Sequence, residues 1–247
     1  MASILRRAYS VARTRLSDYR RRSNLTPPLG SVSFGDLRRI TPVSSVFGLD
    51  RGTPIDRYYI ERFLSDNAVL IHGRVLEIAD RTYTERFGGK QVSQSDVLHA
   101  TGDSADATIV ADLTNAPGIP TDTFDCVILT QTLHYAYRME AMVSEIHRVL
   151  KPGGCVLCTV PGISQISRYD MDRWGDRWRL TTLSARELFE TSFTAELIEV
   201  AAHGNVLAAT AFLHGLATAE LTRTELDVRD DDYQLVVTVR ATKASAS

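Results

Sequence analysis

Polar side chains stand where four apolar runs of the chain end. Glu77 closes the run that starts at Val75, and Asp96 and Asp112 close two weaker runs. The segment Gln131-Thr132-Leu133-His134, which is polar apart from Leu133, follows the run 124–130. Parallel strands covered on both faces read as such continuous apolar runs. Because ligands bind at the carboxyl ends of the strands in open α/β sheets, we expect these four ends to converge on one site.

The spacing of the acidic residues suits a nucleoside. Asp96 lies about twenty residues after the first strand end, where a carboxylate can accept hydrogen bonds from both hydroxyls of a ribose. Asp112 can accept a hydrogen bond from an exocyclic amine, while the backbone of Leu113 reads the edge of the ring. The turn between the first strand and its helix, residues 79–83, contains no glycine. Nucleotide-binding turns at this position are normally rich in glycine.

The elements that must position these residues alternate between strand and helix. We expect strands near 74–79, 90–98 (ending near Asp96), 107–113 (ending at Asp112), 124–131, 155–161, 195–202 and 233–241, with helices between them. This alternation predicts a doubly wound α/β sheet with helices on both faces. A helix over 138–150 should stop at Lys151-Pro152-Gly153-Gly154. We divide the chain into an arm (1–30), a lead-in with a first helix capped by Thr53 (31–68) and a main domain (69–247).

The order of acids, together with "ADLTNAPGIPTDTFDCVILTQTLHYAYRMEAMVSEIHRVLKPGG", resembles the small-molecule branch of the class I S-adenosylmethionine-dependent methyltransferases. The resemblance covers roughly residues 70–160. It implies a mostly parallel seven-stranded sheet with an antiparallel last strand, and S-adenosylmethionine as cofactor. The implied cofactor-binding residues are Glu77, Ala79, Arg81, Asp96, Asp112, Leu113 and Gln131.

The chain departs from this family at the glycines of the first turn. The family pattern of an acid and three alternating glycines falls on Glu77, Ala79, Arg81 and Tyr83. Glycine provides positive φ and close approach of backbone to ligand. Arg81 is a candidate partner for the carboxylate of the cofactor's methionine part. The alternative is a turn that no longer binds cofactor.

His134 and a charged segment are candidates for the acceptor side. His134 follows the fourth strand and is either a general base or a structural histidine. Residues 167–181 hold both tryptophans and form either a substrate lid or a surface helix anchored by them. Aromatic and charged side chains together suit a sugar. The candidate substrate-binding residues are Arg51, Asp56, Tyr169, Asp170, Trp174, Trp178 and Arg179, with Asp176 beside them.

Composition limits the remaining possibilities. Charged residues make up 23% of 247 residues, which is ordinary for a soluble globular protein. The three cysteines predict no disulfide scaffold, and we interpret Cys126, Cys155 and Cys158 as core residues of a cytoplasmic protein. Scattered histidines predict no metal site. The body is acidic, which argues against nucleic acid as a partner.

Residues 1–22 contain seven arginines and one acid. Their apolar residues recur at near-helical spacing, which is compatible with peripheral contact to the inner membrane surface. The other interpretation is a solvated arm or a helix packed on the domain.

The sequence therefore predicts a methyltransferase that acts on a small polar acceptor, a sugar or glycan-linked hydroxyl. Two alternatives stay open: a catalytically silent binding or scaffold protein of the same fold, and a nicotinamide-dependent oxidoreductase, against which the missing glycine fingerprint argues.

Overall fold

The computed structural model describes residues 27–102 and 104–245. The chain divides into two units, residues 1–41 and residues 42–247. In the first unit the described residues include one short 3₁₀ turn, Gly35–Leu37. The basic arm over 1–22, and with it the predicted membrane contact, lies outside the described residues.

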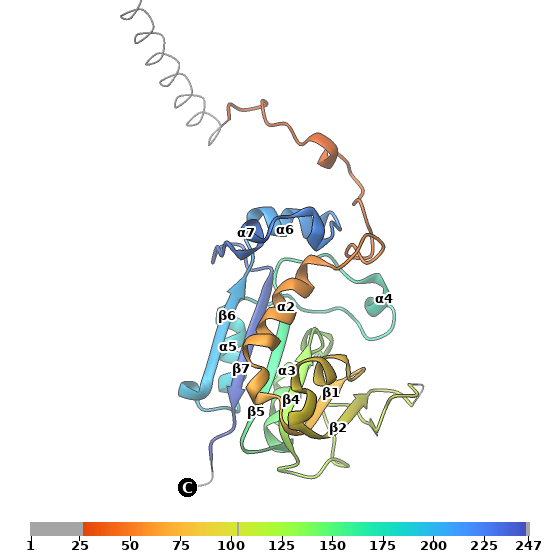
Figure 1. Cartoon of the computed structure of the whole chain (residues 1–247), viewed down its shortest axis with the longest axis vertical. Coiled ribbons are helices and arrows are strands. Elements are labelled where there is room, and N and C mark those ends of the chain that lie inside the picture. The colour runs from red at the N-terminus through yellow and green to blue at the C-terminus, as the bar shows by residue number, and fades with distance from the viewer. Residues whose placement is uncertain (1–26, 103, 246–247) are drawn as a thin grey trace, which may run out of the picture. The chain divides into compact units, whose positions relative to one another are not determined.

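A seven-stranded sheet forms the centre of the second unit (Figure 1). The strands lie in the order β3-β2-β1-β4-β5-β7-β6. Strands β1 to β5 run parallel, and β7 is antiparallel to both β5 and β6. This confirms the predicted doubly wound sheet with an antiparallel last strand. The bounds are β1 Gly73–Ile78, β2 Val92–His99, β3 Ile109–Val110, β4 Phe124–Thr130, β5 Leu150–Pro161, β6 Ile198–His203 and β7 Val236–Thr242.

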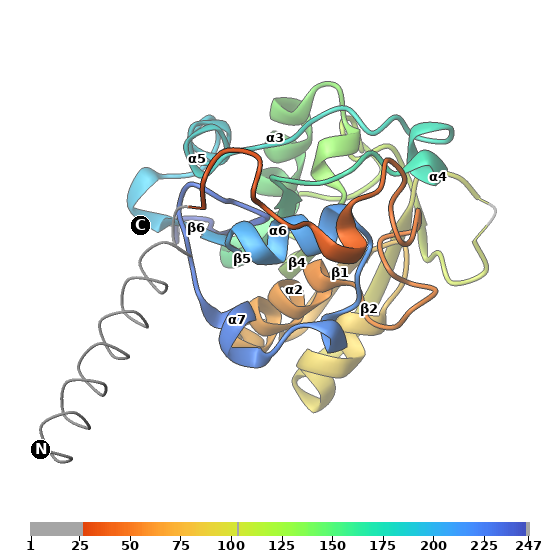
Figure 2. The same ribbon diagram turned by 90° about the horizontal axis from the view of Figure 1, so that it is seen from above.

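Helices cover both faces of the sheet (Figure 2). On one face α3 (Met139–Val149) and α5 (Thr182–Glu190) pack in one apolar cluster with β4 and β5. On the other face α2 (Ile55–Asp66) shares a cluster with α6 (Val206–Leu213) and α7 (Arg223–Asp227). Burial of each large apolar side chain contributes about 1.5–3 kcal/mol. Both clusters use strand residues of alternating direction, so the sheet is apolar on both faces.

Helix α3 ends at Val149, and Gly153 and Gly154 lie in the first part of β5, where the pairing with β4 shifts register. The buried face of α3 consists of Met142, Val143, Ile146 and Val149, at helical spacing. Gly153 has a φ of +81°, which favours glycine. A Cβ on Gly154 would stand 3.0 Å from the carbonyl oxygens of Phe124, Asp125 and Lys151. Glycine at both positions therefore lets β5 lie directly against β4.

Two strand ends differ from the prediction. The strand expected to end near Asp96 continues to His99, because Val97 and Leu98 pair with β1 and are buried. The next strand stops at Val110 rather than at Asp112. There the Asp112 Oδ1 accepts hydrogen bonds from the backbone and hydroxyl of Thr114, which turns the chain out of the strand.

The helix ends also differ in part. Helix α2 begins at Ile55 with Pro54 as its N-cap and no side-chain cap, so Thr53 does not cap it. The helix expected between the strands near 195–202 and 233–241 stops at Leu213, and the chain turns at Gly215, whose φ is +69°. The expected helix after β1 is a single π-type turn, Thr84–Gly88.

The three cysteines are buried and unbonded, as predicted. Cys126 and Cys155 face each other across β4 and β5 with 3.9 Å between their sulfurs. Within the described residues, no helix combines the length and the apolar character required for crossing a membrane.

Candidate functional site

The first strand ends in a turn that Glu77 holds in place. The carboxylate is buried and accepts hydrogen bonds from the backbone nitrogens of Tyr83 (3.1 Å) and Thr84 (2.7 Å). Burial raises the pKa of Glu77, and the backbone hydrogen bonds oppose that rise. A carboxylate at the start of a helical turn satisfies amides that lack partners within the helix. Glu77 therefore positions the turn.

Ala79 keeps the conformation that glycine usually provides. Its φ is +76°, in the left-handed region, and its amide donates to the carbonyl of Leu98 at 3.0 Å. Asp80 supports the next step of the turn, since its Oδ1 accepts a hydrogen bond from the amide of Thr82. The backbone path of a cofactor turn thus persists without the glycine.

Replacing Ala79 by glycine is expected to raise the free energy of unfolding. A residue with a Cβ in the left-handed region costs about 1–2 kcal/mol, and glycine removes this strain. Glycine also gives the unfolded chain more conformational entropy, which offsets about 0.5–1 kcal/mol of the stabilisation. The net expectation is a stabilisation of about 0.5–1 kcal/mol, measured by urea unfolding. Ala100 is also exposed but lacks a positive φ, so Ala100→Gly should destabilise. Equal effects of the two substitutions would contradict the strain at Ala79.

The other two substituted glycine positions point away from the turn. The Arg81 guanidinium donates to the carbonyl of Asp106 at 3.3 Å, on the surface. The Tyr83 ring packs against Phe87 and belongs to the apolar cluster beneath α2. Neither side chain has to fill the space beside Ala79. The observed contact of Arg81 gives no support to the hypothesis that Arg81 binds the cofactor carboxylate.

Asp96 is not placed to bind a ribose. It lies inside β2, and its carboxylate forms an ion pair with Arg74 at 2.7 Å and accepts from Gln94 and Thr108. The strand end carries His99 instead, whose ring meets Trp174 edge to face at 6.0 Å. The expected role of Asp96 depended on the strand ending there, whereas β2 continues to His99.

The remaining predicted cofactor contacts lie on the carboxyl edge of the sheet. Asp112 and the buried Leu113 follow β3, and Gln131 follows β4 with a φ of +47°. The Gln131 amide donates to the carbonyl of Thr159 in β5 at 2.8 Å. The Ala79 turn, Asp112, Leu113 and Gln131 therefore fit an adenosine-containing ligand, whereas the ribose would have to be bound without Asp96.

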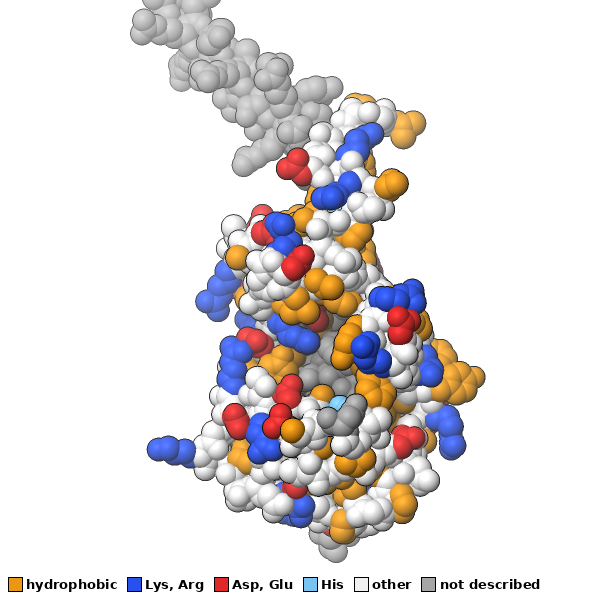
Figure 3. Space-filling view, turned by 90° about the vertical axis from the view of Figure 1, so that its right-hand side faces the viewer, with side chains coloured by type: hydrophobic (Ala, Val, Ile, Leu, Met, Phe, Trp, Pro, Cys, Tyr) orange, Lys and Arg blue, Asp and Glu red, His pale blue; other side chains and the backbone are white. Residues whose placement is uncertain are grey.

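A cavity of about 620 Å³ opens at the same edge, beyond Gln131. The molecular surface is hollowed on the face shown in Figure 3, with cationic and anionic side chains near the hollow. The cavity lies between the first turn of α2, the ends of β4 and β5, and the segment 164–179 that contains α4 (Arg168–Met171). Its charged lining residues are Asp56, Arg57, Arg168, Asp170, Asp176 and Arg179.

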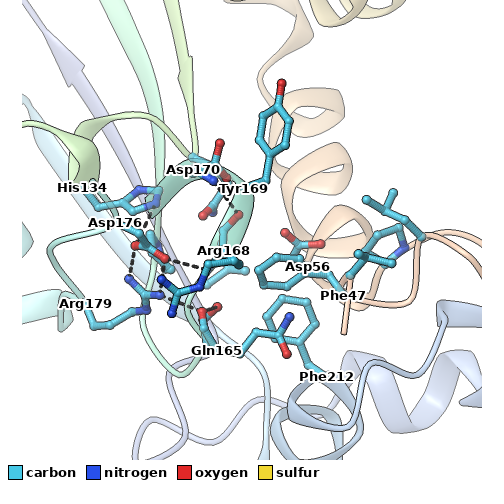
Figure 4. Close-up of a pocket in the computed structure, with 18 of the residues that line it drawn as sticks. Phe47, Asp56, His134, Gln165, Arg168, Tyr169, Asp170, Asp176, Arg179 and Phe212 are labelled. Carbon is cyan, nitrogen blue, oxygen red and sulfur yellow. Dashed lines mark hydrogen bonds and ion pairs between the residues drawn. The ribbon is translucent and has the colours of Figure 1, made fainter. Parts of the chain in front are cut away.

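His134 and Asp176 form one wall of the cavity (Figure 4). Both are buried, and the His134 Nε2 lies 3.7 Å from the Asp176 Oδ1. Burial lowers the pKa of His134 to about 4, although Asp176 opposes the shift. The His134 Nδ1 is buried and has no hydrogen-bond partner among the described residues. His134 is therefore neutral at physiological pH.

Asp176 holds residues 167–179, here called the lid segment, against that wall. Its carboxylate binds both terminal nitrogens of Arg179, at 2.5 and 2.8 Å, and accepts from the amide of Ser167 at 2.8 Å. Burial alone would raise the pKa of Asp176, but the hydrogen bonds from Arg179 and Ser167 lower it below its ordinary value. Asp176 is thus an ionised anchor that joins the two ends of segment 167–179.

Asp56 lies on the opposite wall, with Phe47 and Phe212 (Figure 4). Its side chain is 15% exposed, and Oδ2 lies 3.7 Å from the Arg57 guanidinium. The Oδ1 atom is buried and has no hydrogen-bond partner among the described residues. Burial raises the pKa of Asp56, and Arg57 opposes that rise.

The structure brings together six of the residues predicted for the acceptor side. These cavity-lining residues are Asp56, His134, Tyr169, Asp170, Asp176 and Arg179. Three predicted substrate residues have other contacts. Arg51 forms an ion pair with Glu220, Trp174 contacts His99, and the Trp178 indole donates to the carbonyl of Ala136. The two tryptophans therefore anchor the lid segment rather than line the cavity.

Several lining residues were missed from the sequence. They are Phe47, Arg57, Gln165 and Phe212, which come from three parts of the chain that are far apart in sequence: 47–57, 165 and 212. Arg57 had one available signal, since it follows Asp56 directly. Phe212 had none, because α6 is apolar on every side.

The comparisons with known proteins agree with this fold. Residues 72–158 match the family model described as a methyltransferase domain. No match is found among curated proteins.

Many solved structures share the fold at low identity. A methyltransferase from Archaeoglobus fulgidus is 11% identical with a TM-score of 0.51, covering 76% of this chain and 94% of that one. One from Mesorhizobium loti is 18% identical with a TM-score of 0.51, covering 79% and 100%. The [4+2]-cyclase SpnF is 16% identical with a TM-score of 0.50, covering 76% and 82%.

The domain match spans β1 to most of β5, the part of the sheet that carries the Ala79 turn, Asp112 and Gln131. The strand order and the antiparallel β7 also agree with a methyltransferase fold. Residues 72–158 therefore carry a methyltransferase domain, and the chain has the fold of S-adenosylmethionine-dependent methyltransferases.

Proposed function

We propose that this methyltransferase acts on a hydroxyl group of a small polar acceptor, a sugar or a glycan-linked sugar. The cavity beyond Gln131 carries the proposal, because it joins the cofactor edge of the sheet to a wall of charged and aromatic side chains. Its volume lies within the range of about 300–1,000 Å³ that is usual for small-molecule sites.

S-Adenosylmethionine, when bound, supplies an electrophilic methyl group on its sulfonium sulfur. The chain contributes the Ala79 turn, which Glu77 holds, for the amino-acid side of the cofactor. It contributes Asp112 and Leu113 for the adenine. Much of the rate of such a displacement comes from holding the reactants in line, so these backbone positions matter more than a reactive side chain.

The charges of the cavity favour a neutral acceptor. Three arginines (57, 168, 179) are balanced by three aspartates (56, 170, 176). An anionic acceptor such as a phosphate would gain no net attraction from this lining. Hydroxyl groups can donate to carboxylates and accept from guanidinium groups, and the rings of Phe47, Tyr169 and Phe212 cover C–H surfaces. Both properties suit a sugar ring.

In this proposal His134 has a positioning role beside Asp176 of the lid segment. Its low pKa makes the imidazole a weak proton acceptor, since efficient general bases titrate near the operating pH. Its neutral form can point Nε2–H toward Asp176 without a charge that would need compensation.

Calorimetric titration of the full chain with S-adenosylhomocysteine, followed by an acceptor panel, tests the proposal. The panel contains methyl glycosides of glucose, galactose, mannose and rhamnose, together with phenol, imidazole and ethanolamine. We expect cofactor binding, and methyl transfer to at least one glycoside in preference to the other acceptors. No binding at millimolar cofactor, or transfer to nitrogen or phenol only, would contradict it.

A further inference from the structure

The cavity contains five groups that could exchange a proton with an acceptor, and four of them are already engaged or unsuited. Asp176 is bonded to Arg179 and Ser167. Asp170 is hydrogen-bonded to the Tyr135 hydroxyl, and burial raises the pKa of that tyrosine. His134 is buried against Asp176. Asp56 is the fifth group, and its Oδ1 has no hydrogen-bond partner among the described residues.

The first turn of α2 aims Asp56 at the cavity. Its neighbours Ile55, Tyr59 and Ile60 are buried in the apolar cluster beneath the sheet. The helical periodicity places Asp56 beside that buried stripe, where it borders the cavity lining formed by Pro54 and Phe47. The side chain as a whole keeps 15% exposure, while Oδ1 itself is buried, so a ligand has to reach the carboxylate from the cavity side.

Leaving a buried carboxylate oxygen without a partner is costly, and such atoms in native structures usually have a functional explanation. A hydroxyl group of an acceptor is a suitable donor. The guanidinium of Arg57 lies 3.7 Å from Oδ2, beyond hydrogen-bond distance, so the carboxylate is held by the backbone amides of residues 56 and 57 and not by that side chain.

We propose that Asp56 accepts the proton of the acceptor hydroxyl during methyl transfer, an inference that rests on the proposed function. The hydroxyl oxygen forms the new bond to the methyl carbon, and the sulfur keeps the electron pair of the broken carbon–sulfur bond. The proton moves to a carboxylate oxygen of Asp56 and then to solvent. Burial raises the pKa of this carboxyl, which makes it a better proton acceptor than an exposed aspartate.

The test compares Asp56→Asn with the wild type on the methyl glycoside that the wild type methylates fastest in the panel above. Removal of a general base costs about 100-fold or more in kcat. We expect that loss in kcat, with the KM changed far less and S-adenosylhomocysteine bound as in the wild type. Asp66→Asn, an exposed position near the other end of α2, is the control and should keep full activity.

Chemical rescue separates a base from a structural role. Asp56→Ala with added sodium formate should regain activity in proportion to formate, whereas His134→Gln should show no rescue. Thermal unfolding of each variant verifies folding.

Absence of cofactor binding by the wild type would reject the proposed function itself. A wild type that transfers no methyl group to any glycoside would reject it as well. Once glycoside transfer is seen, two outcomes would overturn the role of Asp56: Asp56→Asn activity within about tenfold of the wild type, or no rescue by formate.

Discussion

Asp176→Ala is expected to lower the free energy of unfolding by about 2–3 kcal/mol and to reduce kcat/KM for the acceptor by about tenfold or more. The substitution removes a buried carboxylate that binds Arg179 and the amide of Ser167 and faces His134. Arg179 would lose its ion pair, and the lid segment would lose its link to the cavity wall. Arg179 keeps 26% exposure, so the loss is smaller than for a fully buried pair.

Denaturant unfolding and initial rates measure the two effects. Asp172→Ala is the matched control, because Asp172 lies in the same segment and pairs with Arg168 at 3.4 Å while both side chains are exposed. Such surface pairs contribute about 0–1 kcal/mol. A control variant as unstable as Asp176→Ala would refute the anchoring role.

The stability that the Asp176 carboxylate contributes depends on pH through the pKa of Asp176, which lies below the ordinary value of 3.8. A lowered carboxyl pKa stabilises the folded state above the unfolded pKa, and this contribution disappears as the pH falls through the folded pKa. The stability difference between wild type and Asp176→Asn should therefore be constant from neutral pH to about 5 and shrink below about 4.

The second large effect is expected at Glu77. Glu77→Ala leaves the amides of Tyr83 and Thr84 without their acceptor, and each buried unpaired group costs about 1–3 kcal/mol. Because the same hydrogen bonds hold the turn beside Ala79, we expect cofactor affinity to fall by about 30-fold or more. Titration with S-adenosylhomocysteine and urea unfolding measure both quantities.

Two further variants sharpen the result at Glu77. Glu77→Gln keeps one acceptor oxygen, so it should lie between the alanine variant and the wild type. Glu85 is an exposed acid in the next turn, and Glu85→Gln should change neither quantity. Wild-type affinity in Glu77→Ala would show that the turn does not bind the cofactor.

The sequence by itself determined the sheet and the place of the turn. Apolar runs such as 126–129 are typical of strands covered on both faces, and the period of α3 marks one buried side. The glycines after α3 marked the entry into β5. These are local patterns, set by the chemistry of neighbouring residues, so they can be read without the fold.

The tertiary structure decided which polar side chains face the site. Whether Asp96 ends its strand depends on how far β2 pairs with β1, and that pairing extends to Leu98. Arg74, 22 residues earlier, then forms an ion pair with the Asp96 carboxylate. Spacing along the chain cannot reveal such a partner, because the contact exists only after two strands have aligned.

The acceptor cavity also depends on long-range packing. Its walls combine α2, α6, the ends of β4 and β5, and the lid segment, and the exposed fraction of Asp56 is set by all of them. The residue types at 79–83 left open whether the cofactor turn survives. The positive φ of Ala79 and the hydrogen bonds of Glu77 arise from strand geometry, which retains the turn where the glycines are missing.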